Sequence, residues 1–504
     1  MLDMFNPKLS SEKVLRQASA KYREREHPLV RLPNAIHTAV FSPSGGGKGV
    51  SIVLPFLQTC SESCVVIDFK GENALITAKH RERHFGQYVA LLDPYEFVTK
   101  TPDTLNTLQF FDRNDPHVLD HCNDLAKALV IREGTEPDPH WNDSAEAWIA
   151  AVIAAVVAYE EPGPTRSLQT VRHILSDPEE LESAIQAMCA STIWDGMLAR
   201  MGRQLRHFVD KEKASILTTV SRHLRFLDTP AVAASTRTSS FDPADLLTGK
   251  LTVYLILPPA HMRAQSALLR VWIGALLRAA IQGGLQEKKR VFFVLDEASS
   301  LGKMDAINDA IDKYRGYGVR LIFLYQSIGQ LKECFAEGKD VTLLSNTSQV
   351  YFGVNDMTTA EQISSRLGES TIIVESGGRS GGTSRQATYD SQSPHSSSGK
   401  SVTDSTNWSQ QARKLLKPEE VLQLPPRTAI TFTPGVPPIC TTLIRYYEES
   451  VLDEPSGTIR RLCKAMTVLL KSAGACAASL GTMWFLAGLL KTRGAGAFTK
   501  MLLE

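Results

Sequence analysis

Two short segments of the sequence carry the residue types needed to bind and hydrolyse a nucleoside triphosphate. Residues 42–49 read Ser-Pro-Ser-Gly-Gly-Gly-Lys-Gly. Consecutive glycines let several backbone N–H groups point at one phosphate, and the N-terminus of a following helix adds positive potential. In such a loop the lysine, here Lys48, contacts the β- and γ-phosphates. Far along the chain, the apolar run 291–295 ends in Asp296 and Glu297. Together the two segments predict a site that binds ATP with Mg²⁺ and hydrolyses the nucleotide.

Each group in these segments has an expected role. Asp296 would hold Mg²⁺, through water, and Glu297 would polarise the attacking water as a general base. The residues expected to bind the nucleotide are Ser44, Gly45, Gly46, Gly47, Lys48, Gly49 and Val50. Taken singly, a glycine run also suits a plain turn, and an acidic pair also suits a soluble strand end. The presence of both halves in one chain favours the nucleotide site.

The glycine loop departs from the usual G-x-x-x-x-G-K-[ST] pattern at both ends. Ser42 stands where the pattern opens with glycine, and Gly49 stands where a hydroxyl side chain normally binds the metal. The direct Mg²⁺ ligand is therefore missing. Either Ser51 reaches the metal, or water fills the position with Asp296 behind it, and the sequence does not choose between these alternatives.

Alternating apolar runs and helical patterns predict an α/β fold with a doubly wound parallel sheet. Strands are expected at 35–41, 64–67, 88–92, 251–257, 291–295, 319–324, 429–433 and 441–444, with a helix after the glycine loop and another at about 263–283. Ligands bind at the carboxyl ends of the strands in such sheets. The glycine loop and the acidic pair both follow strands, so the predicted fold brings them to one edge.

Five stretches of the chain resemble one known family. They are 42–50 (Ser-Pro-Ser-Gly-Gly-Gly-Lys-Gly-Val), 65–73 (Val-Val-Ile-Asp-Phe-Lys-Gly-Glu-Asn), 295–302 (Leu-Asp-Glu-Ala-Ser-Ser-Leu-Gly), 314–327 (Tyr-Arg-Gly-Tyr-Gly-Val-Arg-Leu-Ile-Phe-Leu-Tyr-Gln-Ser) and 415–425 (Leu-Leu-Lys-Pro-Glu-Glu-Val-Leu-Gln-Leu-Pro). In this order the chain resembles a type IV secretion coupling protein of the TraG/VirD4 family. The resemblance implies a RecA-like P-loop motor domain with an inserted all-α domain.

The resemblance also implies roles for two further residues. Arg315 matches a family arginine that reaches the nucleotide of a neighbouring subunit, although it also suits a solvated residue in the charged run 313–315. Gln326 follows the strand 319–324, where its amide would sense the γ-phosphate or would simply end the strand as a polar residue. A trans arginine needs a neighbour, so the expected assembly is a ring, a homo-hexamer.

Composition shifts divide the chain into five predicted parts. They are a polar leader (1–34), the first part of the motor domain (35–114), an inserted all-α domain (115–240), the second part of the motor domain (241–447) and a C-terminal helical tail (448–504). Within the second part, residues 376–411 are rich in Ser, Gly and Thr. Segments with so few large apolar side chains bury too little surface to order themselves, which predicts a flexible loop.

The tail contains nineteen uncharged residues, 472–490, between Lys471 and Lys491. This run is long enough for one membrane crossing. A membrane anchor, a buried or oligomer-packing helix and a surface helix all stay open. Relatives usually begin with transmembrane helices, and nothing in 1–34 suits one, so an anchor at 472–490 would replace them. The expected location is then the cytoplasmic face of the bacterial inner membrane.

The overall charge of +1 gives no long-range attraction to DNA, so any such attraction must come from local basic patches. The resemblance implies an ATP-driven coupling protein that receives relaxase-bound single-stranded DNA, or a protein substrate, and delivers it to a type IV secretion channel. Two other functions stay open. One is a non-hydrolysing recruitment protein that binds nucleotide, and the other is a cytoplasmic DNA translocase without a secretion partner.

Overall fold

The computed structural model describes residues 36–448, apart from 133–137, 287–288, 302–303, 336–337 and 389–394. Contacts group Met1–Ile444 into one unit and Arg445–Glu504 into a second. The predicted leader and the predicted segment 472–490 lie outside the described residues. Among the helices that are described, none is long and apolar enough to cross a membrane.

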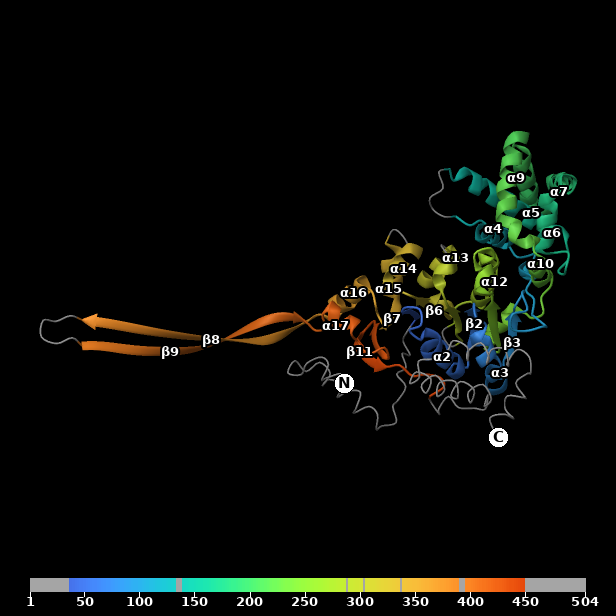
Figure 1. Ribbon diagram of the computed structural model, residues 1–504. Coiled ribbons are helices and arrows are strands. Elements are labelled where there is room, and N and C mark those ends of the chain that lie inside the picture. Colours follow the sequence, from blue (N-terminus) through green and yellow to red (C-terminus); the bar gives the residue numbers. More distant parts are fainter. Residues whose placement is uncertain are drawn as a thin grey trace, which may run out of the picture. The chain divides into compact units, whose positions relative to one another are not determined.

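A mostly parallel sheet runs through the first unit, and its described strands number nine (Figure 1). Their order is β11-β10-β7-β1-β6-β5-β2-β4-β3. The bounds are β1 (His37–Phe41), β2 (Ser63–Asp68), β3 (Tyr88–Leu92), β4 (Leu251–Ile256), β5 (Val291–Leu295), β6 (Val319–Tyr325), β7 (Thr347–Phe352), β10 (Thr428–Thr433) and β11 (Val436–Thr442). All pairs from β7 to β3 are parallel, and only β10 and β11 pair antiparallel. The predicted parallel α/β sheet is confirmed.

Helices cover both faces of this sheet, which explains why its central strands are continuous apolar runs. In β2, Val65 and Ile67 pack into a core shared with α12 (Ser266–Gln282). Cys64 and Val66 pack on the other face with residues of α2 (Leu54–Thr59) and α3 (Glu72–Phe85). The remaining helices of this part are α11 (Pro259–Met262), α13 (Asp305–Asp312), α14 (Ile328–Cys334), α15 (Lys339–Asn346), α16 (Met357–Leu367) and α17 (Pro418–Leu422).

Every regular element described between β3 and β4 is helical. These elements include α4 (Val118–Leu129), α5 (His140–Tyr159), α6 (Leu168–Ser176), α7 (Pro178–Ala190), α8 (Met197–Arg206), α9 (Asp210–Leu224) and α10 (Pro230–Arg237), with short 3₁₀ turns between some of them. Helix α5 is the core of this region, since nearly all its side chains from Ser144 to Ala158 are buried. The region shares one compact unit with the sheet, so its independence as a domain over 115–240 stays a prediction.

The structure corrects the prediction of a flexible loop over residues 376–411. Strands β8 (Glu369–Thr388) and β9 (His395–Lys414) pair antiparallel along their whole length. Composition excluded a hydrophobic core here, but an antiparallel ladder is made by backbone groups and needs no core of its own. Strand β7 was also missed, because Thr-Ser-Gln-Val-Tyr-Phe is not an apolar run, and β11 begins at Val436 instead of 441.

Candidate nucleotide site

The glycine loop follows β1 directly and has a backbone that glycine alone suits. Its first residue is tied to the neighbouring strand, because the Ser42 N–H donates to the Tyr325 carbonyl oxygen over 3.1 Å. Gly45 and Gly47 have φ values of 78° and 95°, in the left-handed region. A Cβ atom on Gly46 would lie 2.1 Å from the Ser42 Oγ. The left-handed backbone therefore favours glycine at positions 45 and 47, and position 46 requires glycine because a Cβ atom would not fit there.

A helix starts after the loop, as predicted, but its first turn is irregular. Residues Gly49–Val53 form a π-helical turn in which the Leu54 N–H donates to the Gly49 carbonyl oxygen. Pro55 follows this turn as the second residue of α2, and it has no N–H to donate to a carbonyl oxygen of the turn. The turn contains Gly49 and Val50, two of the predicted nucleotide contacts.

Ser51 is the nearest hydroxyl residue after Gly49. Its Oγ atom is buried and has no hydrogen-bond partner among the described residues. A Cβ atom on Gly49 would meet nothing within 4 Å, so the missing hydroxyl residue at this position is not excluded by space. The buried Ser51 oxygen therefore remains a candidate metal ligand. A water molecule in the same ligand position remains the alternative.

Lys48 lies folded back onto the loop. Its Nζ donates to the carbonyl oxygens of Ser42 (2.6 Å) and Pro43 (3.3 Å), and only 9% of the residue is exposed. Burial lowers the pKa of Lys48, while the charges of Glu297 and Asp296 act in the opposite direction. The ammonium group is thus held near two carboxylates, and a phosphate would replace carbonyl oxygens as its acceptor.

Asp296 and Glu297 follow β5, one strand away from β6 and two from β1. Burial raises the pKa of Asp296, and the neighbouring charge of Glu297 raises it further, while Lys48 and Lys70 act against this rise. Glu297 has a φ of 49°, and its N–H donates to the Asp296 Oδ1 over 3.1 Å. Holding a non-glycine residue in the left-handed backbone region costs on the order of 1–3 kcal/mol, and such strained residues are typical of functional sites.

Gln326 follows β6 and joins this group. Its Nε2 donates to the Glu297 Oε2 over 3.4 Å. Its backbone N–H donates to the Gln330 Oε1 (2.8 Å), and the Gln330 Nε2 donates to the Ser299 Oγ (2.7 Å). Sequence reasoning missed Gln330 and Ser299, which brace the turns after β6 and β5 against each other. The four-residue spacing from Gln326 to Gln330 was the only available signal.

The stretch after β2 also reaches the site. Asp68 is buried and accepts from the Ala74 N–H at 2.8 Å, a local hydrogen bond. Burial and the nearby charges of Asp296 and Glu72 raise the pKa of Asp68 to about 6. Lys70 is exposed, and its positive charge acts on both Lys48 and Asp296. Its position follows from the pairing of β2 with β5, which the sequence did not reveal.

Arg315 does not join this group. It lies in the 3₁₀ turn Tyr314–Tyr317, before β6, whereas Gln326 follows the same strand. Seven residues of strand span about 20 Å at ~3.3 Å per residue. The exposed Arg315 instead lies near the start of β1, where its charge helps to lower the pKa of His37. The chain therefore keeps Arg315 and its own glycine loop at opposite edges of the sheet.

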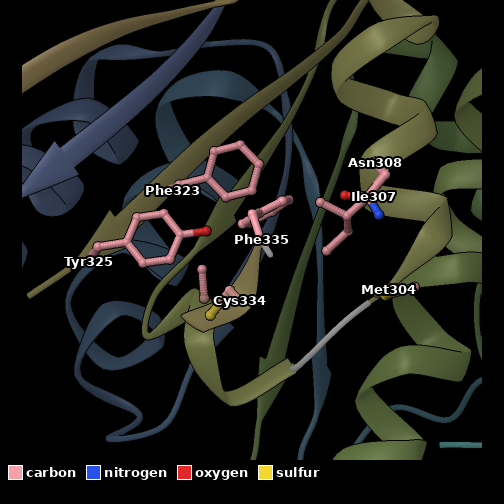
Figure 2. A pocket seen from close by; sticks show the side chains of 8 residues that line it. Met304, Ile307, Asn308, Phe323, Tyr325, Cys334 and Phe335 are labelled. Carbon is pink, nitrogen blue, oxygen red and sulfur yellow. The ribbon is translucent and has the colours of Figure 1, made fainter. Parts of the chain in front are cut away.

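A small cavity lies beside the turn that follows Glu297 (Figure 2). Its lining residues are Ala298, Met304, Ile307, Asn308, Phe323, Tyr325, Cys334 and Phe335. Figure 2 shows side chains from β6 facing those of α13 and of the end of α14 across this space. The lining is largely apolar and includes no lysine or arginine, so this cavity does not suit a phosphate group. The glycine loop remains the candidate site.

Comparison with known proteins agrees with these elements. Residues 6–469 match the family model described as "Type IV secretory system Conjugative DNA transfer". The chain belongs to this family. The coupling protein VirD4 of Bartonella henselae is 30% identical over 427 residues, which cover 82% of this chain and 64% of that protein. The conjugal transfer protein TraG of Rhizobium radiobacter is 29% identical over 415 residues, covering 80% and 61%. The chain thus spans a little under two thirds of these relatives.

Solved structures of the conjugative coupling protein TrwB have the same fold. The complex of TrwB with ADP and Mg²⁺ is 17% identical, has a TM-score of 0.58 and covers 85% of this chain and 92% of its own. The complex with a non-hydrolysable ATP analogue has a TM-score of 0.59. The predicted RecA-like P-loop fold is confirmed, and so is the resemblance to coupling proteins of the TraG/VirD4 family.

Proposed function

We propose that this chain is an ATP-hydrolysing coupling protein of a type IV secretion system. It receives relaxase-bound single-stranded DNA, protein substrates or both, and delivers them to the secretion channel. One observation carries the proposal. Lys48, Glu297 and Gln326 follow the adjacent strands β1, β5 and β6 and lie at one edge of the sheet, where the charges of Lys48 and the acidic pair act on each other.

The residues of this edge divide the work of hydrolysis. The amides of Gly45–Gly47 and the Lys48 ammonium bind the phosphates. The Asp296 carboxylate and the buried Ser51 hydroxyl are oxygen donors of the kind Mg²⁺ prefers, and they would hold an ion that would neutralise phosphate charge. Glu297 orients and deprotonates the attacking water. Gln326, which donates to Glu297, couples nucleotide state to movement of β6 and α14.

Arg315 acts on the nucleotide of a neighbouring copy. Its position at the opposite edge from its own glycine loop supports this role, because a distance of about 20 Å exceeds the reach of one arginine side chain. In a neighbour's site the guanidinium would stabilise charge on the transferring phosphoryl group. The assembly that gives every site such a neighbour is a closed ring, which we take to be a homo-hexamer.

The work of this ring takes place at the cytoplasmic face of the inner membrane. Membership of a conjugative transfer family supports this location, since the substrate must leave the cell. The uncharged run 472–490 would serve as the anchor. Cell fractionation of the full chain, and of a chain that ends at residue 448, tests this part separately from catalysis.

The decisive experiment measures steady-state ATP hydrolysis with and without single-stranded DNA, over a range of protein concentrations. The proposal expects DNA-stimulated turnover that rises cooperatively with concentration. Glu297→Gln should bind ATP normally and lose at least ~100-fold in turnover, the usual contribution of a general base. Glu333→Gln, an exposed carboxylate on α14, is the matched control and should keep turnover. Nucleotide binding without turnover in the unaltered chain, even with secretion partners present, would instead identify a recruitment protein.

A further inference from the structure

The hairpin β8–β9 is the one described part of the first unit that lacks a covering layer. The two strands form a sheet of their own, and no third described strand pairs with them. Over Ser380–Ser384 and Ser398–Thr403 every residue is exposed, although successive side chains point to opposite faces. Figure 1 shows β8 and β9 as a long twisted ribbon. Along these residues both faces of the ribbon are therefore accessible.

Both faces of the ribbon carry large apolar side chains that are not buried. Ile373, Val402 and Trp408 are 64%, 58% and 67% exposed. The register places them on one face, because Val402 lies opposite Gly381, Trp408 opposite Glu375, and both partners are an even number of residues from Ile373. The other face carries Ile372 and Val374, which are partly exposed, and small or polar residues that include Ser380, Gly382, Ser384, Gly399, Ser401 and Thr403. Apolar side chains left exposed on a ribbon without a covering layer indicate a contact surface.

The long unpaired edges of β8 and β9 also indicate that another strand pairs with them. An isolated two-stranded hairpin is marginally stable in water, and its edges are templates for further pairing. The edge strands of the main sheet, β3 and β11, have five and seven residues, whereas β8 and β9 have twenty each. Within the described chain no other edge matches the hairpin. A second copy of the chain supplies two edges of the required length and the same twist.

We propose that β8 of one copy pairs antiparallel with β9 of the next copy, in the register that the hairpin itself uses. This inference rests on the ring assembly of the proposed function, in which each copy has two equivalent neighbours. In this register Glu369 of one copy lies opposite Lys414 of the next, an opposite-charge pair that favours the alignment.

The size of this contact suits a stable interface. Twenty residues at ~3.3 Å each give an edge of about 66 Å, and a sheet is about 10 Å thick, so pairing covers on the order of 700 Å² per partner. Standard protein interfaces cover about 800 Å² per partner. Each copy uses both of its hairpin edges, so the ring gains one such contact at every subunit boundary.

The base of the hairpin is linked to the nucleotide site through α16. The Ile328 N–H, two residues after Gln326, donates to the Thr359 Oγ1 near the start of α16 (3.3 Å). Near the end of α16, the Ser364 Oγ donates to the Leu416 carbonyl oxygen at 2.6 Å, just beyond β9. In each copy, α16 therefore links the base of the hairpin to the segment that follows Gln326. Pairing of hairpins would join these linked elements of neighbouring copies.

Disulfide formation between two chains that each carry one added cysteine tests the register. Ser380 and Thr403 are exposed Cα partners within the hairpin. One tagged chain carries Ser380→Cys and a second, differently tagged chain carries Thr403→Cys, so any bond between these positions must join two copies. The co-expressed full-length proteins are oxidised and the tags are followed on a non-reducing gel. We expect a heterodimer band that is absent from either chain alone and from the chain without added cysteines.

Ser380→Cys combined with Ser398→Cys is the matched control, because Ser398 lies opposite Arg385, five residues out of register. That offset is about 16 Å along the strand, beyond the reach of a disulfide. Equal bands for both combinations, or no band for Ser380→Cys with Thr403→Cys, would overturn the inference. Turnover and ring mass are measured on the same samples. An active ring without the bond refutes hairpin pairing alone, whereas the bond without ATP turnover refutes the proposed catalysis and leaves the pairing in place.

Discussion

His37 makes the stability of the sheet depend on pH in a way that can be calculated. It begins β1 and is fully buried, and its Nδ1 accepts a hydrogen bond from the Leu321 N–H (3.1 Å). Burial, followed by the positive charges of Arg320 and Arg315, lowers the pKa of His37 from 6.5 to about 4. His37→Asn keeps a side-chain acceptor for Leu321 and removes the titrating group.

The sign follows from comparing the folded and unfolded chains. Between pH 6.5 and 4 the unfolded chain binds the His37 proton more readily, so the stability contributed by neutral His37 is present above pH 6.5 and is lost as pH falls to 4. The full loss is about 3.4 kcal/mol, from 2.5 pKa units at ~1.36 kcal/mol each. Between pH 7 and pH 5 the same relation gives a loss of about 1.8 kcal/mol.

Urea unfolding at pH 7, 6 and 5, under reversible conditions, measures this loss. The free energy of unfolding of the unaltered chain should fall by about 1.8 kcal/mol more than that of His37→Asn between pH 7 and pH 5. The difference between the two curves removes groups common to both chains. Asp68 is one of these groups, and its raised pKa acts in the opposite sense, stabilising the fold as pH falls through about 6.

His84→Asn, at an exposed position on α3, is the control and should run parallel to the unaltered chain. If the His37→Asn curve also runs parallel, within about 0.5 kcal/mol, His37 is not a buried neutral group and the reasoning is refuted. A steeper loss in the variant would contradict the sign of the pKa shift.

Three further predictions concern the site and its surroundings. Gly46→Ala should weaken ATP binding at least ~10-fold in a fluorescent-nucleotide titration, because its Cβ would lie 2.1 Å from the Ser42 Oγ, and Ser42→Gly in the same chain should restore binding. Arg315→Ala should lose at least ~1,000-fold in turnover and Glu297→Gln at least ~100-fold, yet an equal mixture of the two chains should regain about a quarter of the unaltered chain's turnover, since random pairing gives half times half intact sites; no recovery would exclude action in trans. Asp93→Ala removes a buried carboxylate that accepts hydrogen bonds from three N–H groups of the loop after β3. The change should destabilise the fold by about 3 kcal/mol and speed hydrogen exchange in that loop. Unchanged exchange would contradict this role of Asp93.

Much of the site could be predicted from the sequence because it depends on local rules. Gly45, Gly46 and Gly47 have the geometry that a run of glycines suggests, and Asp296 and Glu297 lie at a carboxyl strand end because an apolar run precedes them. Parallel strands all end at the same edge, so residues that follow separate strands converge. The type and order of the elements are enough to place these residues at one edge of the sheet.

Other features depend on which strands become neighbours. The insertion of β6 between β1 and β5 brings Gln326 to Glu297, and the pairing of β2 with β5 brings Lys70 toward Asp296. Neighbour order is decided by contacts between residues far apart in the chain, and a propensity or a spacing contains no information about it. The positive φ of Glu297 has the same origin, since surrounding contacts impose it against local preference.

The β8–β9 hairpin shows most clearly what the sequence could and could not predict. The sequence of 376–411 determined that this segment has no core of its own, and that conclusion holds, because its described residues are exposed. The tertiary structure alone decided that β8 and β9 would pair along twenty residues each, since backbone N–H and C=O groups pair without regard to side-chain hydrophobicity. The sequence by itself thus determined the chemistry and the fold class. Which segments lie side by side was decided by the folded chain as a whole.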